Sequence, residues 1–369
     1  ISSISTSMFE GCTGVTEARF NLKNFPAGIS VKKMFPNIKT FYAPKATEIP
    51  AEMFKDCTNL SSTSLGSLYV IGARAFQNCA LKTINFYADT IGEYAFDGNP
   101  ATKVQLDYIE TIDCDIFGSS ASTIQYVYMD MLKDFGNNTF RNFTTLSTIE
   151  LDSLVNVPNN CFYGLKNLKN VTIPQAQSIG DKAFYNCTEL SIIGIDSAKS
   201  IGANAFYNCI GLNEFYADGI EEVDASIFDG CTNLYVVSLN SLKELPSTFG
   251  NIKSLEVFYA NSVKEVPAYA FQNCTNLHTV SLSGVTKIGD FAFVNTALST
   301  ITANAGTIGT CAFMNTPLKT FTSSAVHIGE SAFMGCTSLT TVKCGLLETI
   351  GDRAFKIAQH SINSLIQII

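Results

Sequence analysis

Residues 179–195 read I-G-D-K-A-F-Y-N-C-T-E-L-S-I-I-G-I, and from Ile201 the chain reads I-G-A-N-A-F-Y-N-C-I-G-L-N-E-F-Y-A. The phenylalanine of this unit, called the anchor here, occurs 17 times, mostly at intervals of 20 to 23 residues. The exceptions, 26 and 19 residues, lie on either side of Phe35. A short fixed period predicts a solenoid, in which each repeat buries its apolar face only against its neighbours. The anchors are Phe9, Phe35, Phe54, Phe76, Phe96, Phe117, Phe140, Phe162, Phe184, Phe206, Phe228, Phe249, Phe271, Phe293, Phe313, Phe333 and Phe355.

The second half of each repeat has the pattern of a corner followed by a short strand. In the quoted unit, Leu190 is followed by Ile193 and Ile195. Alternation of apolar and other residues places successive side chains on opposite faces of a strand, so one face points inward. One such strand per turn, always at the same phase, predicts a parallel sheet along the stack.

The first half of each repeat predicts a tight corner and a compact turn. We expect the glycine of I-G, as at Gly180 and Gly202, to adopt backbone angles that other residues resist. Proline fills this position in some turns, as at Pro158 and Pro267, which suits a corner. The A-x-x-A-F segment that follows is too short for a helix, and we expect a single helical or 3₁₀ turn there.

The full pattern, I-G-x-x-A-F-x-x-C-x-x-L-x-x-I-x-I, resembles the BspA-like leucine-rich repeats, also called the Treponema pallidum type. The resemblance covers nearly the whole chain. It implies a mainly β or α/β fold: a right-handed leucine-rich-repeat coil of about 16–17 turns, with one short parallel strand per repeat. It also implies a bacterial or protist cell surface, a role in adhesion or in host or matrix protein binding, and no catalytic residues. The pattern departs near Phe35, and at Ser120 and Phe143, which replace the cysteine.

Nothing in composition divides the chain, so we expect a single domain. Residues 1–355 are predicted to form one continuous solenoid with a truncated first turn, and residues 356–369 a partial repeat or cap. Because the chain begins within a repeat, we expect that a leader has been removed; the alternative is a cytosolic protein without one. No stretch approaches the ~20 apolar residues of a membrane span. The net charge of −8 argues against a nucleic-acid partner.

Eight of the twelve cysteines stand three residues after an anchor, among them Cys187, Cys209 and Cys231. Leu165 and Thr296 fill the same slot in other turns. A slot shared by these residue types predicts a small buried position, in which free cysteine acts as a small hydrophobe. The alternative is a ladder of disulfides between turns. We expect no metal site, because the cysteine spacing is that of the repeat.

The chain shows no G-x-S-x-G, P-loop, H-E-x-x-H or G-x-G-x-x-G motif, and its three histidines share no phase. We therefore expect no catalytic residues and no cofactor.

The outward face of the predicted sheet, usually the concave one, varies along the chain. Over the middle turns it combines tyrosines with carboxylates, which suits a basic partner. The alternative is an ordinary solvated face whose tyrosines pack on one another. The candidate ligand-binding residues are Tyr126, Tyr128, Asp130, Glu150, Asp152, Asp196, Glu214, Tyr216, Asp218 and Tyr259; the structural anchors are Phe184, Phe206, Phe228 and Phe271, with Cys187, Cys209 and Cys231.

These observations favour a non-enzymatic scaffold, extracellular or at the cell surface, that binds a protein or glycan through the concave sheet. One alternative is a structural spacer in a larger surface protein. A second is a carbohydrate-active protein, since carboxylates on adjacent turns, such as Asp130 and Glu150, are the residue type that glycoside hydrolysis uses.

Twelve free thiols are expected per chain, because parallel side chains in neighbouring turns do not reach the dihedral angle of a disulfide. Thiol titration of denatured, unreduced protein measures this number. A count far below twelve contradicts the prediction and favours the cross-linked ladder.

Overall fold

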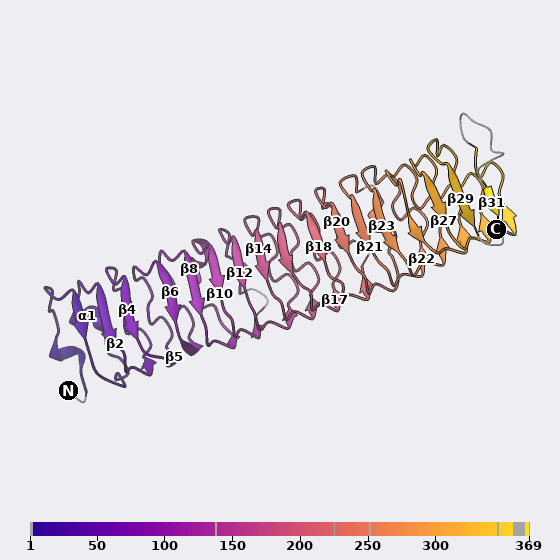
Figure 1. The fold of residues 1–369 in the computed structure, drawn as a ribbon. Helices are drawn as coiled ribbons and strands as arrows, with labels where there is room; N and C mark the ends of the chain where they lie inside the picture. The colour runs from indigo at the N-terminus through magenta and orange to yellow at the C-terminus, as the bar shows by residue number, and fades with distance from the viewer. Residues whose placement is uncertain are drawn as a thin grey trace. The chain divides into compact units, whose positions relative to one another are not determined.

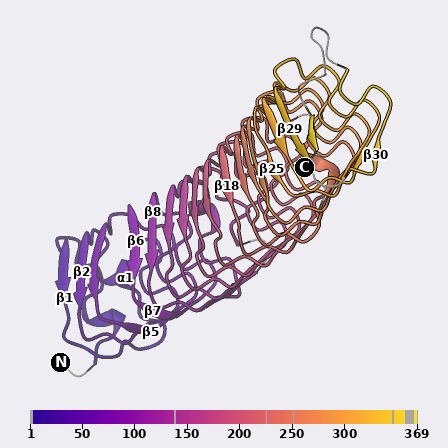
Figure 2. The ribbon, with the colours of Figure 1, turned by 45° about the vertical axis from the view of Figure 1, so that its right-hand side comes forward.

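The computed structural model describes residues 3–136, 139–224, 226–250, 252–344, 347–356 and 366–368. The chain divides into two compact units, residues 1–175 (the first unit) and 176–369 (the second unit). Each unit by itself is a stack of coils that repeat the same path (Figures 1 and 2). Helices are short throughout the described ranges, and none combines the length with the apolar character that crossing a bilayer requires.

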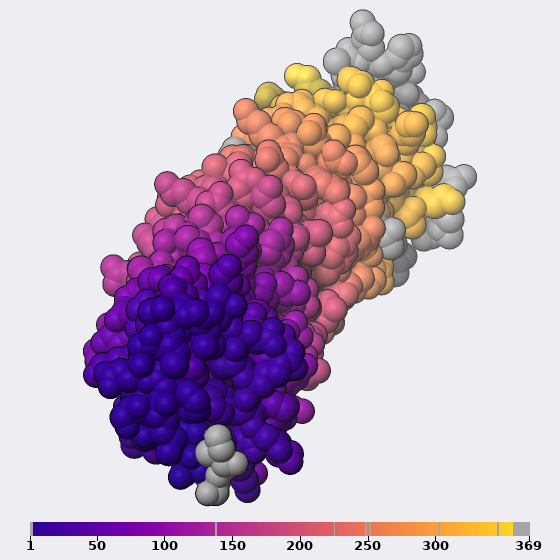
Figure 3. Space-filling model, turned by 90° about the vertical axis from the view of Figure 1, so that its left-hand side faces the viewer, coloured from indigo at the N-terminus to yellow at the C-terminus, as the bar shows by residue number. Residues whose placement is uncertain are grey.

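The first unit carries two sets of parallel strands. Its N-terminal turns, in indigo, face the viewer in Figure 3. The principal strands are β1 (Glu17–Arg19), β2 (Thr40–Ala43), β4 (Ser62–Leu65), β6 (Thr83–Phe86), β8 (Lys103–Leu106), β10 (Tyr126–Tyr128), β12 (Thr148–Glu150) and β14 (Asn170–Thr172). The second set is β3 (Glu48–Ile49), β5 (Leu68–Ile71), β7 (Ala88–Ile91), β9 (Thr111–Ile112), β11 (Asp134–Phe135) and β13 (Asn156–Val157). The helical segments are η1 (Thr6–Met8), α1 (Val31–Met34) and η2 (Gly118–Ser122).

The second unit has the same two sets. Its principal strands are β16 (Ile192–Gly194), β18 (Glu214–Tyr216), β20 (Val236–Ser238), β21 (Val257–Tyr259), β23 (Thr279–Leu282), β25 (Thr302–Ala303), β27 (Thr320–Thr322), β29 (Thr341–Cys344) and β31 (Ile366–Ile368). The second set is β15 (Ser178–Ile179), β17 (Ser200–Ile201), β19 (Glu222–Val223), β22 (Glu265–Val266), β24 (Lys287–Ile288), β26 (Thr307–Ile308), β28 (His327–Ile328) and β30 (Thr349–Ile350). One 3₁₀ segment is present in its described residues, η3 (Ser247–Phe249).

The predicted parallel coil is confirmed. Strand β18 pairs in parallel with β20, and β20 with β21, with equivalent repeat positions opposite each other. Phe215 points inward and is fully buried, while Glu214 and Tyr216 on either side face outward. The second set of strands is an addition to the single strand expected per turn. These shorter strands pair in parallel at the I-G corner, as where Ile201 lies opposite Val223.

The anchors form the centre of the stack. Phe184, Phe206, Phe228 and Phe271 are buried, as predicted. The rings of Phe184 and Phe206 lie parallel with centroids 5.3 Å apart. This is the offset stacking that aromatic rings favour, and it follows from placing the same residue at the same phase of successive turns.

The reason expected for the I-G glycine is wrong. None of the I-G glycines falls in the left-handed region that would require glycine. Instead, a Cβ atom on Gly329 would lie 2.6 Å from the carbonyl carbon of Gly309 and 2.6 Å from the amide nitrogen of Thr310. In the turns that carry I-G, as at Gly329, glycine is needed because the backbone of the adjacent turn lies too close for a Cβ atom.

The A-x-x-A-F segment is not the helical turn expected in most repeats. Lys182 and Asn186, two residues before and after an anchor, have φ of 53° and 65°. This alternation turns every second amide toward the next coil, as where the Phe184 amide donates to the carbonyl of Ala205 at 2.8 Å. Asparagine tolerates the left-handed region, and its amide side chains also form a ladder, with Asn208 Nδ2 donating to Asn186 Oδ1 at 2.5 Å.

Seven of the eight cysteines in the slot are buried, as predicted, and Cys12 is half-buried, but they are not simply hydrophobes. Cys209 Sγ donates to the carbonyl of Phe184 in the preceding turn at 3.1 Å. Asn99 Nδ2 similarly donates to the Phe76 carbonyl at 2.8 Å. A donor in this slot satisfies a buried carbonyl that would otherwise be costly to bury. Burial raises the pKa of the Cys231 thiol to about 12, so that this side chain stays a donor.

The structure accounts for the irregular repeat at Ser120 and describes part of the C-terminal segment. The expected departure near Ser120 coincides with η2, and Ser120 Oγ supplies the missing donor by bonding to the Phe96 carbonyl at 2.8 Å. Strand β31 pairs with β29 and lies in the segment 356–369, whose role as a partial repeat or cap stays a prediction. The rest of that segment from residue 357 lies outside the described residues. One continuous domain over residues 1–355 stays a prediction.

Gly329→Ala is expected to destabilise the second unit by about 1–3 kcal/mol, because the new methyl group collides with the backbone of the adjacent turn. Urea denaturation followed by far-UV circular dichroism measures the change. The matched control is Gly194→Ala, where a Cβ meets nothing within 4 Å and the shift should stay under about 0.5 kcal/mol. Equal shifts for the two variants would contradict the close-approach explanation.

Two variants of Cys209 that have similar shapes test whether this slot needs a hydrogen-bond donor. Cys209→Thr keeps a hydrogen-bond donor near the Phe184 carbonyl and Cys209→Val does not, so the threonine variant should be more stable by about 1 kcal/mol. The same urea denaturation compares them. A more stable valine variant would restore the hydrophobic interpretation.

Candidate functional site

The candidate binding residues face outward from the principal sheets, and the two units share them. Those in the first unit are Tyr126, Tyr128, Asp130, Glu150 and Asp152; those in the second unit are Asp196, Glu214, Tyr216, Asp218 and Tyr259. Each is exposed or half-buried, in agreement with the alternation predicted for the strands.

In the first unit, the two tyrosines of β10 lie beside Lys103 of β8. Tyr126 is 40% exposed and stands opposite Lys103 in the strand register. Lys103 Nζ lies 4.8 Å from the centroid of the Tyr128 ring, a cation–π contact. Glu150 is the register partner of Tyr128 on the other side. This region therefore presents aromatic rings with charges of both signs.

Next to these tyrosines, Asp107, Asp130 and Asp152 occupy the same repeat position in successive turns. Burial and the negative charges of Asp152 and Asp107 raise the pKa of the Asp130 carboxyl. The three carboxylates thus repel one another, in line with the basic partner suggested by the sequence. No group of three or more acidic, cysteine or histidine side chains suited to a metal ion occurs in the described part of the chain.

In the second unit, Asp218 belongs to a hydrogen-bond network that supports the sheet face. Its Oδ1 accepts from Ser238 Oγ at 2.6 Å, and from the backbone amide and the side chain of Asn240, each at 3.1 Å. Burial tends to raise the pKa of Asp218, but these donors outweigh it and lower the pKa. We therefore assign Asp218 a structural part in the face.

The network continues across two further turns, which the sequence analysis missed. Asn261 Nδ2 donates to Asn240 Oδ1 at 2.8 Å, and Asn261 Oδ1 accepts from Ser281 Oγ at 2.9 Å and from Ser283 Oγ at 3.1 Å. The sequence carried a signal for this network, because Asp218, Asn240, Asn261 and Ser283 occupy the same position in four successive repeats. These short side chains hold one another across the strands, so this edge of the face is rigid.

Glu214 and Tyr216 line a shallow hollow of about 410 Å³ on the sheet face of the second unit. Its lining includes Ile192, Asn213, Glu214, Tyr216 and Tyr235. Tyr216 is 46% exposed, and Ile192 is 65% exposed although it lies in a strand. An isoleucine this exposed contributes nothing to the packing of the core and is not needed on a solvated face. The hollow beside it is therefore the best-defined candidate site.

Three of the lining residues named above, Ile192, Asn213 and Tyr235, were absent from the predicted set. Ile192 stands at an outward position of β16, so an apolar residue at that phase was the available signal. Tyr235 immediately precedes β20, outside the alternating outward positions, and only the structure brings it to Glu214. Of the predicted residues, Tyr259 lies opposite Ser238 in the register, and Asp196 is exposed beyond the end of β16.

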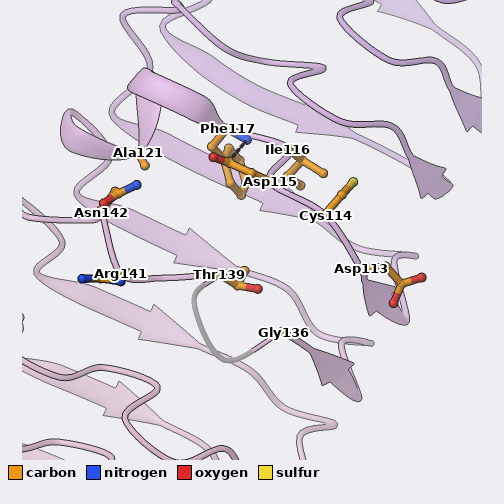
Figure 4. A pocket seen from close by; sticks show the side chains of 10 residues that line it. All are labelled: Asp113, Cys114, Asp115, Ile116, Phe117, Ala121, Gly136, Thr139, Arg141 and Asn142. Atoms are coloured by element: carbon orange, nitrogen blue, oxygen red, sulfur yellow. Dashed lines mark hydrogen bonds between the residues drawn. The ribbon is translucent and has the colours of Figure 1, made fainter.

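A second hollow, of about 490 Å³, lies in the first unit, where residues of the segment 113–121 line it together with Gly136, Thr139, Arg141 and Asn142 (Figure 4). Asp115 Oδ1 accepts from the amides of Phe117 at 3.1 Å and Gly118 at 2.8 Å, which ties down one wall. Burial, with the charges of Glu93, Asp113 and Asp115, raises the pKa of the Cys114 thiol. A raised pKa makes cysteine a poor nucleophile, so the geometry gives this hollow no evident chemistry.

Comparison with solved structures finds leucine-rich repeat proteins. One from Eubacterium ventriosum is 21% identical, with 71% of this chain and 83% of that chain covered and a TM-score of 0.35. One from Bacteroides ovatus is 22% identical, with 70% and 76% covered and a TM-score of 0.39. The T. pallidum leucine-rich repeat protein is 27% identical, with 40% and 75% covered and a TM-score of 0.36. Comparison with curated proteins gives no match.

The family model described as a BspA type leucine rich repeat region matches the chain in six overlapping copies. The copies span residues 1–103, 47–169, 89–213, 155–278, 199–319 and 306–367. Together they cover almost every turn, including the irregular ones near Phe35 and Phe117. The chain therefore belongs to the BspA-type leucine-rich repeat family.

Proposed function

We propose that this chain is a non-enzymatic scaffold at the cell surface, and that it binds a protein through the outward face of its principal sheets. Leucine-rich repeats are a scaffold commonly used for protein interaction, and their stacked strands offer an extended surface. The family resemblance supports an extracellular or cell-surface location and a role in adhesion.

A single observation carries this proposal: large apolar and aromatic side chains are exposed on strands of the sheet face. Ile192, Tyr216 and Tyr126 are the clearest cases. A purely solvated face has no need of them, whereas tyrosine and exposed aliphatic groups anchor protein interfaces. The spacer alternative gives no reason for their exposure.

The backbone beneath these side chains is already ordered. Tyr126 and Tyr216 lie on strands paired on the stack, with Val127 and Phe215 buried directly beside them in the core. A partner would therefore meet side chains held on a rigid support. Little ordering of the backbone would oppose binding, which improves the affinity that a given contact area provides.

A protein suits this face better than a glycan or nucleic acid. The exposed isoleucine beside Tyr216 requires an apolar contact, and the carboxylates favour a basic surface. The hollow at Tyr216 is shallow and open, whereas carbohydrate hydrolysis benefits from a site that excludes water. The binding partner is thus expected to be a protein with basic and apolar groups side by side.

An array of matrix proteins and glycans probed with the intact chain tests the proposal. We expect capture by at least one protein, and a Kd raised about tenfold or more in Ile192→Thr/Tyr216→Thr or in Tyr126→Thr/Tyr128→Thr, because exposed anchors are lost. Threonine keeps the strand preference at each position. Surface plasmon resonance with the captured protein measures the affinity.

The matched controls are Tyr69→Thr and Ile210→Thr, which remove exposed apolar side chains away from the principal sheets. They should leave the affinity unchanged. Capture of no protein at all, or equal affinity for the sheet-face and control variants, would overturn the proposal.

A further inference from the structure

Glu214 lies in the second-unit hollow with its carboxylate held in one orientation. The hydroxyl group of Tyr216 donates to Oε2 at 3.0 Å, and the hydroxyl group of Tyr235 donates to Oε1. The two tyrosines approach from adjacent turns, so each carboxylate oxygen is bound by one phenol. The hydrogen bond to Glu214 raises the pKa of both phenols, which therefore remain protonated donors.

This arrangement leaves the carboxylate with unused acceptor capacity. An ionised carboxylate has two acceptor positions on each oxygen, about four in all. The two phenols occupy one position on each oxygen. One position on each oxygen remains, which is the pattern that a bidentate donor such as a guanidinium group requires.

The walls of the hollow suit the stem of a long cationic side chain. Ile192 provides an exposed aliphatic surface, and Tyr216 provides a half-exposed ring. Gly194, two residues after Ile192 on β16, leaves open space, since a Cβ there would meet no atom within 4 Å. Methylene groups can pack on the isoleucine while a cation lies near the aromatic ring.

The charge of the surrounding face also favours a cation. The four segments 191–196, 213–218, 235–240 and 256–261, all described by the structure, contain the acids Asp196, Glu214, Asp218 and Glu256 and no lysine or arginine. His278, in the turn that follows these segments, has its Nε2 3.7 Å from Oε2 of Glu256. Two phenols thus orient the Glu214 carboxylate, and these segments contain no lysine or arginine that could pair with it.

We propose that this hollow is a socket for one arginine side chain of the protein partner. The guanidinium group donates two parallel hydrogen bonds to the carboxylate of Glu214, and its stem packs on Ile192 and Tyr216. Lysine fits less well, because its ammonium is a compact charge that cannot form the paired contact. The inference deepens the proposed function and rests on it for the identity of the occupant as part of a protein.

The test uses N-acetyl-arginine methylamide as the probe, with the citrulline analogue, which has the same shape and no charge. Saturation-transfer NMR with the intact chain should detect the arginine probe with a Kd of about 1–10 mM, the range expected for one side chain, and citrulline at least about tenfold more weakly. Glu214→Gln should abolish the preference for arginine over citrulline. Ile192→Thr should weaken both probes a few-fold.

The matched control is Glu222→Gln, which removes an exposed carboxylate from β19, outside the principal sheet, and should leave arginine binding unchanged. Circular dichroism verifies folding of each variant, and Tyr216→Phe, which keeps Glu214 charged but frees its Oε2, gives a second variant expected to bind arginine a few-fold more weakly. Equal signals for arginine and citrulline, or retained preference in Glu214→Gln, would overturn the socket.

The outcome is separable from that of the proposed function. Arginine selectivity that depends on Glu214, together with capture of no protein on the array, supports the socket and overturns the protein-binding scaffold. Protein capture that depends on the sheet face, with no arginine selectivity, overturns the socket alone.

Discussion

The close approach of successive turns is the constraint from which the rest of the structure follows. Strands in a sheet lie ~4.8 Å apart, so every residue at a given phase contacts its equivalent in the next coil. At the I-G corner even a methyl group is too large, because the backbone of the neighbouring turn is already there. The same spacing places phenylalanine on phenylalanine and asparagine on asparagine. Each repeat position must therefore be compatible with a copy of itself.

This constraint also explains which side chains occupy the interior. The anchor carbonyl is buried, and the residue three positions after the next anchor commonly donates to it, as a thiol from Cys209 or an amide from Asn99. Residues without a donor, such as Leu165, also fill the slot. The slot therefore selects for size first and for a donor second, which is why such different residue types recur there.

Outward positions are free of that requirement, and the two units use them differently. In the first unit, stacked aspartates repel one another, and the pKa of Asp130 rises. In the second unit, Asp218 is followed by asparagines and serines that donate to one another, and its pKa falls. Like residues on adjacent turns thus create either an acidic surface that favours a cation or a self-satisfied polar edge. The exposed side chains of Tyr126, Tyr216 and Ile192 also occupy outward positions.

The sequence by itself determined the coil, the burial of the anchors and the outward direction of residues such as Tyr126 and Tyr216, because a period of about 22 residues and an alternation of two are visible along the chain. It did not determine why glycine stands at the I-G corner, what the cysteines bond to, or that Tyr235 and Tyr216 share Glu214. Those features depend on distances between atoms some 20 residues apart in the chain, which only the stacking of complete turns establishes. Tertiary structure therefore decided the site, since its hollow is formed between turns and belongs to no single repeat.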